Sequence, residues 1–444
     1  MTTTLEDLFS LRLRLNGHRG EVQCVHASGS SLVSGGADAS VRLWDLAAGR
    51  AARALLAPAA DGTEGGVTAV CCGAADGPAA NWIYAAVATH VYGWDLRAPG
   101  MIVREPACAF NNLASDEIGH IALHEMSGAL AAADDAGDVH IVDVGSMAAA
   151  PGATSGAIVA LRGGHSSICS WVAFRPGVQT CECCTAGLDA LCVRWDWRIA
   201  AKLGAWALAA PSGPFAAALA GEAAAALGGE VAGGSSSSGG GAGSSSSSSG
   251  AAAEQPPAQL LNPRHAHCVS YAPDGGCFAV ALGDGSVEVR LAESGEPICA
   301  VDAHRAACSQ AHFAPQLSPA LALRTDGDED EDVAAIAARG LPLLSAGDDR
   351  QVRLWSVEGI AGRGGPQGGG GGKRQRRGQA AAECDDADEE DDEADFGEPG
   401  FREIASVRLG HKPNGIAAAS DPAGGGRALV CVATTGEAIE VLAV

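Results

Sequence analysis

The sequence predicts an all-β protein that is built from repeated units, and three observations predict this class. Three segments of twelve residues align without a gap, SGGADASVRLWD, TAGLDALCVRWD and SAGDDRQVRLWS, and they begin at Ser34, Thr185 and Ser345. Apolar and polar residues alternate within them, as expected of a strand with one buried face. The 444 residues include 61 glycines and only 4% aromatic residues, which is typical of a chain with many turns. We therefore expect one repetitive domain over residues 1–444.

Each of the three segments carries the same polar residue types at the same offsets. A Ser or Thr lies four residues before an Asp, the Asp lies six residues before a Trp, and a His lies upstream of each segment. These groups can form a buried chain of hydrogen bonds that ties a loop to two strands. The expected tetrads are His18, Ser34, Asp38 and Trp44; His165, Thr185, Asp189 and Trp195; and His304, Ser345, Asp349 and Trp355.

This pattern resembles the WD40 repeat, in which each unit forms one four-stranded blade of a β-propeller. Four weaker copies place Trp94, Val142, Arg290 and Val441 at the position of the tetrad Trp, and the second of them keeps Asp135 near the tetrad Asp. After three long insertions are left out, the equivalent positions are 46 to 53 residues apart. The resemblance therefore implies a seven-bladed β-propeller.

The ends of the chain predict how the ring closes. An open propeller would expose the edge of a sheet, and the sequence ends just after the third strand of the seventh unit. In residues 11–15 leucine alternates with arginine, as in a strand. We expect this N-terminal strand to complete the seventh blade.

Three segments interrupt the repeats, and we expect them to be insertions between strands. Residues 211–258 are rich in Ala, Gly and Ser, residues 319–336 are acidic, and residues 361–400 combine a basic cluster with an acidic run. The first and third contain too little apolar surface to fold and are expected to be disordered. The basic cluster, Lys373 to Arg377, fits a nuclear import signal, a nucleic-acid patch or an ordinary solvated loop.

Charge and cysteine content restrict the class of protein. The net charge is −24, but six acidic residues lie within 326–332 and nine within 385–395, so the remainder is only mildly acidic. Because no basic excess is present, binding to nucleic acid is not expected. The 15 cysteines follow no disulfide framework, and the N-terminus lacks a secretory signal. We expect reduced thiols, no membrane span and a location in the cytoplasm, the nucleus or both.

Catalysis and metal binding are the less favoured interpretations. Recurrent Ser, His and Asp suggest a hydrolase, but a catalytic site need occur only once, and no GxSxG elbow, phosphate loop or HExxH motif is present. Cys181, Cys183 and Cys184 include a CxxC spacing, and Cys71 and Cys72 are adjacent, but no matching second pair of ligands follows. We expect no enzyme activity, no cofactor and no metal.

Three longer segments carry a closer resemblance within the WD40 superfamily. HSSICSWVAFRP at 165–176, LLNPRHAH at 260–267 and LAAADDAGDVHIVDV at 130–144 resemble a seven-bladed branch proposed to supply substrate receptors of cullin-RING ubiquitin ligases. The resemblance implies docking on the ligase's propeller adaptor through Trp-Asp-x-Arg endings. Two such endings are present, one with Trp94, Asp95 and Arg97 and the other with Trp195, Asp196 and Arg198.

Other functions remain open at this stage. Arg after Trp-Asp-x is common in WD40 repeats, and it can simply pair with a neighbouring acid or face solvent. The alternatives are a general WD40 scaffold, a peptide reader at the mouth of the channel, and an RNA-associated scaffold that uses the basic insertion. In every case we expect a monomer within a larger complex, with other proteins as partners.

Overall fold

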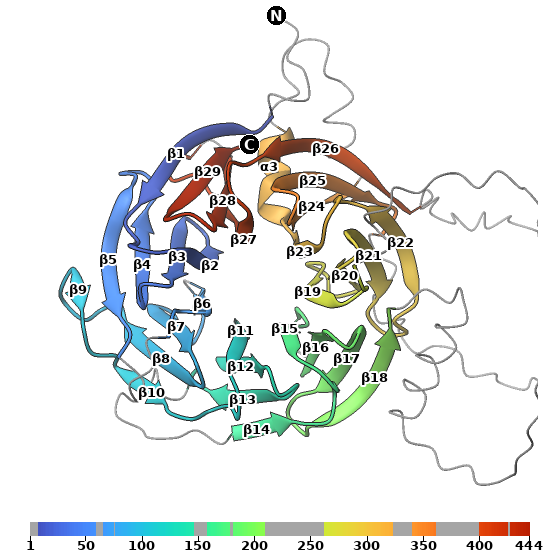
Figure 1. Cartoon of the computed structure of the whole chain (residues 1–444), viewed down its shortest axis with the longest axis horizontal. Helices are drawn as coiled ribbons and strands as arrows, with labels where there is room; N and C mark the ends of the chain where they lie inside the picture. The colour runs from blue at the N-terminus through green and yellow to red at the C-terminus, as the bar shows by residue number, and fades with distance from the viewer. Residues whose placement is uncertain are drawn as a thin grey trace, which may run out of the picture.

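Seven sheets surround a common axis and form a closed ring (Figure 1). The fold is therefore a seven-bladed β-propeller, as the sequence predicts. The computed structural model describes residues 8–58, 65–74, 76–145, 158–177, 181–208, 262–322, 340–360, 399–424 and 427–444.

The first four blades follow one another along the chain. Their strands are β2 (Val22–Ser28), β3 (Ser31–Gly36), β4 (Ser40–Asp45) and β5 (Arg50–Leu56) in blade one; β6 (Ala69–Cys72), β7 (Trp82–Val87), β8 (His90–Asp95) and β10 (Cys108–Phe110) in blade two; β11 (Ile118–Leu123), β12 (Ala129–Asp134), β13 (Val139–Asp143) and β14 (Ile158–Leu161) in blade three; and β15 (Cys169–Phe174), β16 (Glu182–Gly187), β17 (Leu191–Asp196) and β18 (Ala201–Ala207) in blade four.

The last three blades complete the ring. Their strands are β19 (Ala266–Tyr271), β20 (Cys277–Leu282), β21 (Ser286–Leu291) and β22 (Pro297–Asp302) in blade five; β23 (Cys308–Phe313), β24 (Gly340–Gly347), β25 (Gln351–Glu358) and β26 (Gly400–Arg408) in blade six; and β27 (Pro413–Ser420), β28 (Ala428–Thr434), β29 (Ala438–Ala443) and β1 (Ser10–Asn16) in blade seven.

Within the described residues the core consists of seven apolar clusters, one between each pair of neighbouring blades. Second strands such as β7, β12 and β20 are buried at every position, because both faces of the sheet pack against other blades. Their Ala, Val and Ile residues are small or β-branched, which suits close packing near the axis. The seven positions equivalent to the tetrad Trp all lie on the third strand of a blade.

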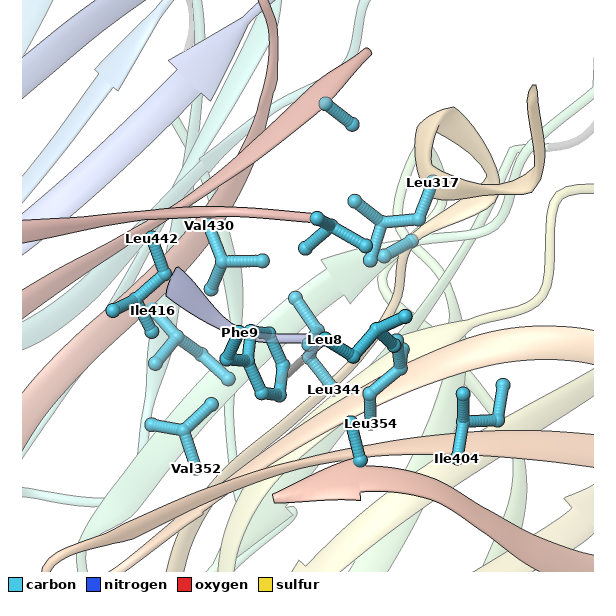
Figure 2. Packing of buried hydrophobic residues seen from close by; sticks show 14 of the residues in the cluster. Leu8, Phe9, Leu317, Leu344, Val352, Leu354, Ile404, Ile416, Val430 and Leu442 are labelled. Atoms are coloured by element: carbon cyan, nitrogen blue, oxygen red, sulfur yellow. The ribbon is translucent and has the colours of Figure 1, made fainter. Parts of the chain in front are cut away.

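The N-terminal segment closes the ring as the sequence predicts. β1 runs antiparallel to β29, so the first described strand completes the last blade. Just before it, Leu8 and Phe9 are only 6% and 7% exposed and enter the apolar cluster between blades six and seven, beside Leu344 and Val430 (Figure 2). The closure is therefore held by a strand ladder and by two apolar side chains.

Two features of the connections are not evident from the sequence. β9 (Ile102–Val103) leaves blade two and pairs in parallel with the outer strand of blade one. A 3-10 turn, η2 (Pro315–Leu317), precedes the segment 319–336 that was predicted as an acidic insertion, and a short helix, α3 (Ser318–Ala322), overlaps the start of that segment. Leu317 and Leu321 lie in the same cluster as Phe9, so the start of that segment belongs to the core.

The rest of the predicted insertions falls outside the described residues. This applies to all of 211–258, to 323–336 and to 361–398, which contains Lys373 to Arg377, whereas Gly400 already begins β26. Among the residues that are described, no helix combines the length and apolar character needed to cross a membrane.

Candidate functional site

The three tetrads have the same geometry in blades one, four and six. In blade four, Trp195 Nε1–H donates to Thr185 Oγ1 (3.2 Å), Thr185 Oγ1 lies 2.8 Å from His165 Nε2, and His165 Nδ1 lies 3.0 Å from Asp189 Oδ1. Because the ionised carboxylate can only accept, His165 Nδ1–H donates to Asp189. With the ring hydrogen on Nδ1, His165 Nε2 accepts from the Thr185 hydroxyl, whose oxygen accepts from the Trp195 indole. The other two tetrads reproduce these contacts within 0.4 Å.

The tetrad carboxylates are held in the ionised form. Burial alone raises the pKa of Asp189, but hydrogen bonds from His165 and from the Ser166 and Leu191 N–H groups outweigh it and lower the pKa. The same balance lowers the pKa of Asp38 and Asp349. The hydroxyls of these networks belong to fully buried residues, so the recurrent Ser, His and Asp tie loop to strand.

Blades two and three depart from the tetrad. Trp94 is 1% exposed, and among the described residues its Nε1–H has no hydrogen-bond partner, because Ala85 occupies the position of Ser34. In blade three the buried carboxylate is that of Asp134, which His140 Nε2 approaches to 3.2 Å. Asp135, which the sequence suggested, lies outside this contact.

Blade five replaces the tetrad with an ionic network. Arg290, at the position of the tetrad Trp, donates from Nε to Glu288 Oε2 (2.9 Å) and from Nη1 to the Gly295 carbonyl (2.9 Å). Arg264 pairs with the other oxygen of Glu288 and, at 2.7 Å, with Asp284 Oδ2. The buried Glu288 is therefore shared between two arginines, which supply the charge that its burial requires.

The two Trp-Asp-x-Arg corners lie on the same face of the propeller. They follow β8 and β17, which are the third strands of their blades, and all third strands run in the same direction along the axis. We call this side, where the third strands end, the third-strand face. Trp94 and Trp195 are buried, so they anchor the corners and leave Arg97 and Arg198 as the exposed side chains.

Arg97 is bound to its own aspartate. Its Nε and Nη2 atoms donate to Asp95 at 2.8 to 3.1 Å, and Asp95 also accepts the Arg97 backbone N–H. The hydrogen bond from Arg97 lowers the pKa of Asp95. The Arg97 side chain is 57% exposed, so this corner presents a compact neutral pair to a partner.

Arg198 has a different environment. Its guanidinium carbon lies 5.3 Å from the centroid of the Trp197 ring, and only its backbone N–H bonds to Asp196. No described carboxylate lies within ion-pair distance of this guanidinium. Trp197 in turn packs edge-on against Phe174, with ring centroids 5.7 Å apart. The corner therefore presents an uncompensated cation on an aromatic base.

Exposed apolar side chains accompany the Arg198 corner. Ile199 is 72% exposed, and Met126, in the turn between β11 and β12, is 61% exposed. His124 lies two residues before Met126, and its ring centroid is 5.9 Å from that of Trp197 and 5.2 Å from that of Phe174. We call Met126, Arg198 and Ile199 the Arg198 patch. A cation flanked by apolar side chains has the composition of a protein-docking surface.

The cysteines contribute to packing. All described cysteines carry free thiols, and burial raises the pKa of Cys72 and Cys268 to about 12, which keeps these thiols neutral. Across the described ranges, no three His, Cys, Asp or Glu side chains gather closely enough to hold a metal ion.

Comparison with known proteins agrees with this architecture. The family model described as WD domain, G-beta repeat (WD40) matches residues 9–45. These residues are therefore similar to one repeat of that family. The match runs from β1 through β4, so this sequence repeat begins with the outer strand of one blade and continues into the next. WD40 propellers are in general non-enzymatic scaffolds for protein interactions.

A solved structure shows the same fold. The crystal structure of the WD40 beta propeller domain of Doa1 is similar to this chain, with a TM-score of 0.56 and 12% sequence identity over 98% of this chain and 96% of that chain. At this identity the likeness shows the fold alone. A comparison with curated protein sequences gives no significant match.

Proposed function

We propose that this protein is a non-enzymatic docking scaffold that binds the propeller adaptor of a cullin-RING ubiquitin ligase through Arg97 and Arg198. The observation that carries the proposal is the presence of two exposed arginines at equivalent corners of one face. The identity of the partner rests on the resemblance of residues 130–144, 165–176 and 260–267 to WD repeat-containing protein 53.

The two corners contribute unequally in this proposal. Arg198 has no carboxylate partner among the described residues, so a partner's carboxylate or carbonyl pair gains a new charge-assisted contact with its planar fork. The Arg97 guanidinium already donates hydrogen bonds to Asp95, so a partner must share or displace these bonds. We therefore expect Arg198 to dominate the affinity and Arg97 to contribute orientation.

The test compares single arginine variants in an affinity purification from cells with quantitative mass spectrometry. Arg198→Ala is expected to reduce recovery of the adaptor by about tenfold or more, as for a central interface arginine, and Arg97→Ala by less. Arg162→Ala is the matched control. The Arg162 side chain is also exposed, at 72%, but this residue lies on the opposite face, just before the His165 loop. The control should bind like the unaltered chain.

Each alternative function gives a different result. If the unaltered protein does not recover the adaptor, the ligase proposal is wrong and a general scaffold or peptide reader replaces it. If RNA is recovered instead, and this binding weakens steeply with salt and disappears on deletion of residues 373–377, the RNA-associated function replaces it. Thermal unfolding of each variant shows whether a lost partner reflects a lost fold.

A further inference from the structure

The centre of the propeller contains two cavities that meet. One has a volume of about 430 Å³ and the other about 610 Å³. They share six lining residues, which we call the channel waist: His26, His120, Ile121, Trp171, His312 and Phe313. The waist joins the two ends of the channel, and no residue of the tetrads or of the Arg198 patch belongs to it.

The waist is a cluster of stacked rings. His120 stacks on Trp171 with centroids 3.6 Å apart and planes at 21°, and His312 lies 5.4 Å from the same indole. The rings come from first strands of different blades, and the ladder shifts register just before both His120 and Trp171. Such bulges redirect side chains, here at the innermost strands.

Backbone contacts fix the tautomer of two of the imidazoles. The Cys72 N–H points to His26 Nδ1 and the Val172 N–H to His120 Nδ1, each at 3.4 Å. A ring nitrogen that accepts a hydrogen bond carries no hydrogen, so the hydrogen of each neutral ring resides on Nε2. Within the described residues neither Nε2–H has an acceptor. The waist therefore offers two unused N–H donors.

His312 has the opposite arrangement. Gln310 is oriented by the backbone, since its Oε1 accepts the Ile416 N–H at 2.9 Å and its amide donates to the Asn414 carbonyl at 3.1 Å. His312 Nε2, 3.3 Å from this Oε1, must therefore be the donor. Its Nδ1 keeps a lone pair that can take up a proton.

The charges around the waist leave the cluster neutral and without a counter-ion. Among the described residues, Glu125, in the turn after β11, is the only carboxylate that lines either cavity, and Arg175 is already paired with Glu182 and Glu293. The other titratable groups along the described lining are His124, Tyr271 and the thiols Cys24 and Cys71, with Cys72 and Cys268 beside the histidines.

Burial accounts for the neutral state. It lowers the pKa of His26 and of His312 to about 4, and it lowers that of His120 well below its ordinary value, with further contributions from the neighbouring histidines. It raises the pKa of the Cys24 thiol to about 12 and that of Tyr271 well above its ordinary value, so neither supplies a negative charge near pH 7.

We propose that the channel waist binds an anionic oxygen group, a carboxylate or a sulfate-like anion, and takes up one proton when it does so. His26 and His120 donate their Nε2–H groups to the anion, and the proton enters His312 Nδ1. The added charges then cancel for a carboxylate, and one negative charge remains for sulfate. This proposal is independent of the docking function, because it uses the channel and leaves the corner arginines free.

The coupling between proton uptake and anion binding determines how the affinity for the anion depends on pH. Without a bound anion, the lowered pKa values of His26 and His312 favour neutral rings, so the folded state loses stability as pH falls from 6.5 toward 4. A bound anion stabilises the protonated ring and raises its pKa. Anion affinity should therefore increase as pH falls. For one linked proton the increase is about tenfold per pH unit between the pKa of the ring with the anion bound and its pKa without the anion.

The test measures binding to the full chain by isothermal titration calorimetry at pH 5.5, 6.5 and 7.5. The probes are sodium sulfate and a blocked tetrapeptide that carries one glutamate, with its glutamine counterpart as the uncharged control. We expect both anions to bind more tightly at pH 5.5, with proton uptake visible as a buffer-dependent heat, and the glutamine peptide not to bind. A preference for sulfate or for the glutamate peptide identifies the source of the ligand.

Three variants make the proposal falsifiable. His120→Phe keeps a ring against Trp171 but removes one donor, so anion binding should fall about tenfold or more at every pH. His312→Gln removes the proton acceptor, so weak binding should persist without its pH dependence. His411→Gln, on an exposed residue outside the waist, should change neither. Equal binding by all three variants, or affinity that does not rise as pH falls, overturns the proposal.

Discussion

Blades four and five are neighbours with the same backbone and different polar networks. Their third strands pair with their second strands in the same register, with Trp195 opposite Cys183 and Arg290 opposite Phe278. In both, the ladder to the fourth strand shifts register just before this residue. Blade four has Trp195 of a tetrad at this position. Blade five has Arg290, which shares the buried Glu288 with Arg264.

The comparison shows that a polar side chain at this position can be satisfied by either of two networks, one built around Trp195 and the other around Arg290. The Asp turn is common to both solutions, since Asp284 Oδ1 accepts the Ser286 N–H at 3.0 Å, as Asp189 Oδ1 accepts the Leu191 N–H at 3.2 Å. The networks differ in charge, so they should respond differently to the loss of one member.

The largest effect is expected from Arg290→Ala in blade five. It leaves Glu288 buried with one arginine instead of two, and removal of one partner from a buried ion pair costs about 3 kcal/mol or more. Urea unfolding of this variant measures the loss, with Arg402→Ala on an exposed residue as the control. A loss similar to that of the control would mean that Arg264 alone satisfies the carboxylate.

A smaller effect is expected from Asp189→Ala in blade four. The unsatisfied His165 N–H should lower the free energy of unfolding by roughly 1–3 kcal/mol. Because the pKa of Asp189 is lowered on folding, its contribution is present above pH 3.8 and is lost as pH falls below that value. The difference from the unaltered chain should therefore stay constant from pH 7 to about pH 4 and shrink as pH falls below 3.8 in urea titrations. A difference that stays constant below pH 3.8 would contradict the tetrad.

The smallest effect is expected from Glu293→Gln, which loosens the contact between the two blades. Glu293 lies in blade five and its carboxylate reaches Arg175 and Arg194 of blade four, each at 2.6 Å. Its side chain is 61% exposed, so solvent screens the pairs and the loss should stay below about 1 kcal/mol. Unfolding at low and high salt checks this. A loss that persists in 1 M salt would show that the contact is more than a surface pair.

Local repeats explain why so much of the fold could be predicted. The offsets among His, Ser or Thr, Asp and Trp are fixed by one blade's turn and strands, so three copies predict the sheet and its register. The closing strand was predictable because residues 11–15 alternate and the seventh unit is one strand short.

The remaining features depend on contacts between segments that no repeat relates. The waist histidines occupy first strands of three separate blades, and only the closed ring brings His120 and His312 to the same indole. The corners show the same limit. Arg97 and Arg198 end identical motifs, but Trp197 follows Asp196 where Leu96 follows Asp95, and this neighbour decides which arginine lies on an aromatic ring.

Ring closure by β1 has a consequence for biosynthesis. During translation β1 leaves the ribosome before every other described strand, but its partner β29 is the last to emerge. Domains fold as units during synthesis, and unpaired edges invite aggregation. The nascent chain therefore carries Leu8, Phe9 and the unpaired strand β1 without their partners until β29 has been synthesised. A product that terminates before β29 would keep Leu8, Phe9 and the edge of β1 exposed permanently. Exposed apolar side chains and unpaired strand edges favour aggregation, and they are features by which chaperones can distinguish incomplete chains from closed propellers.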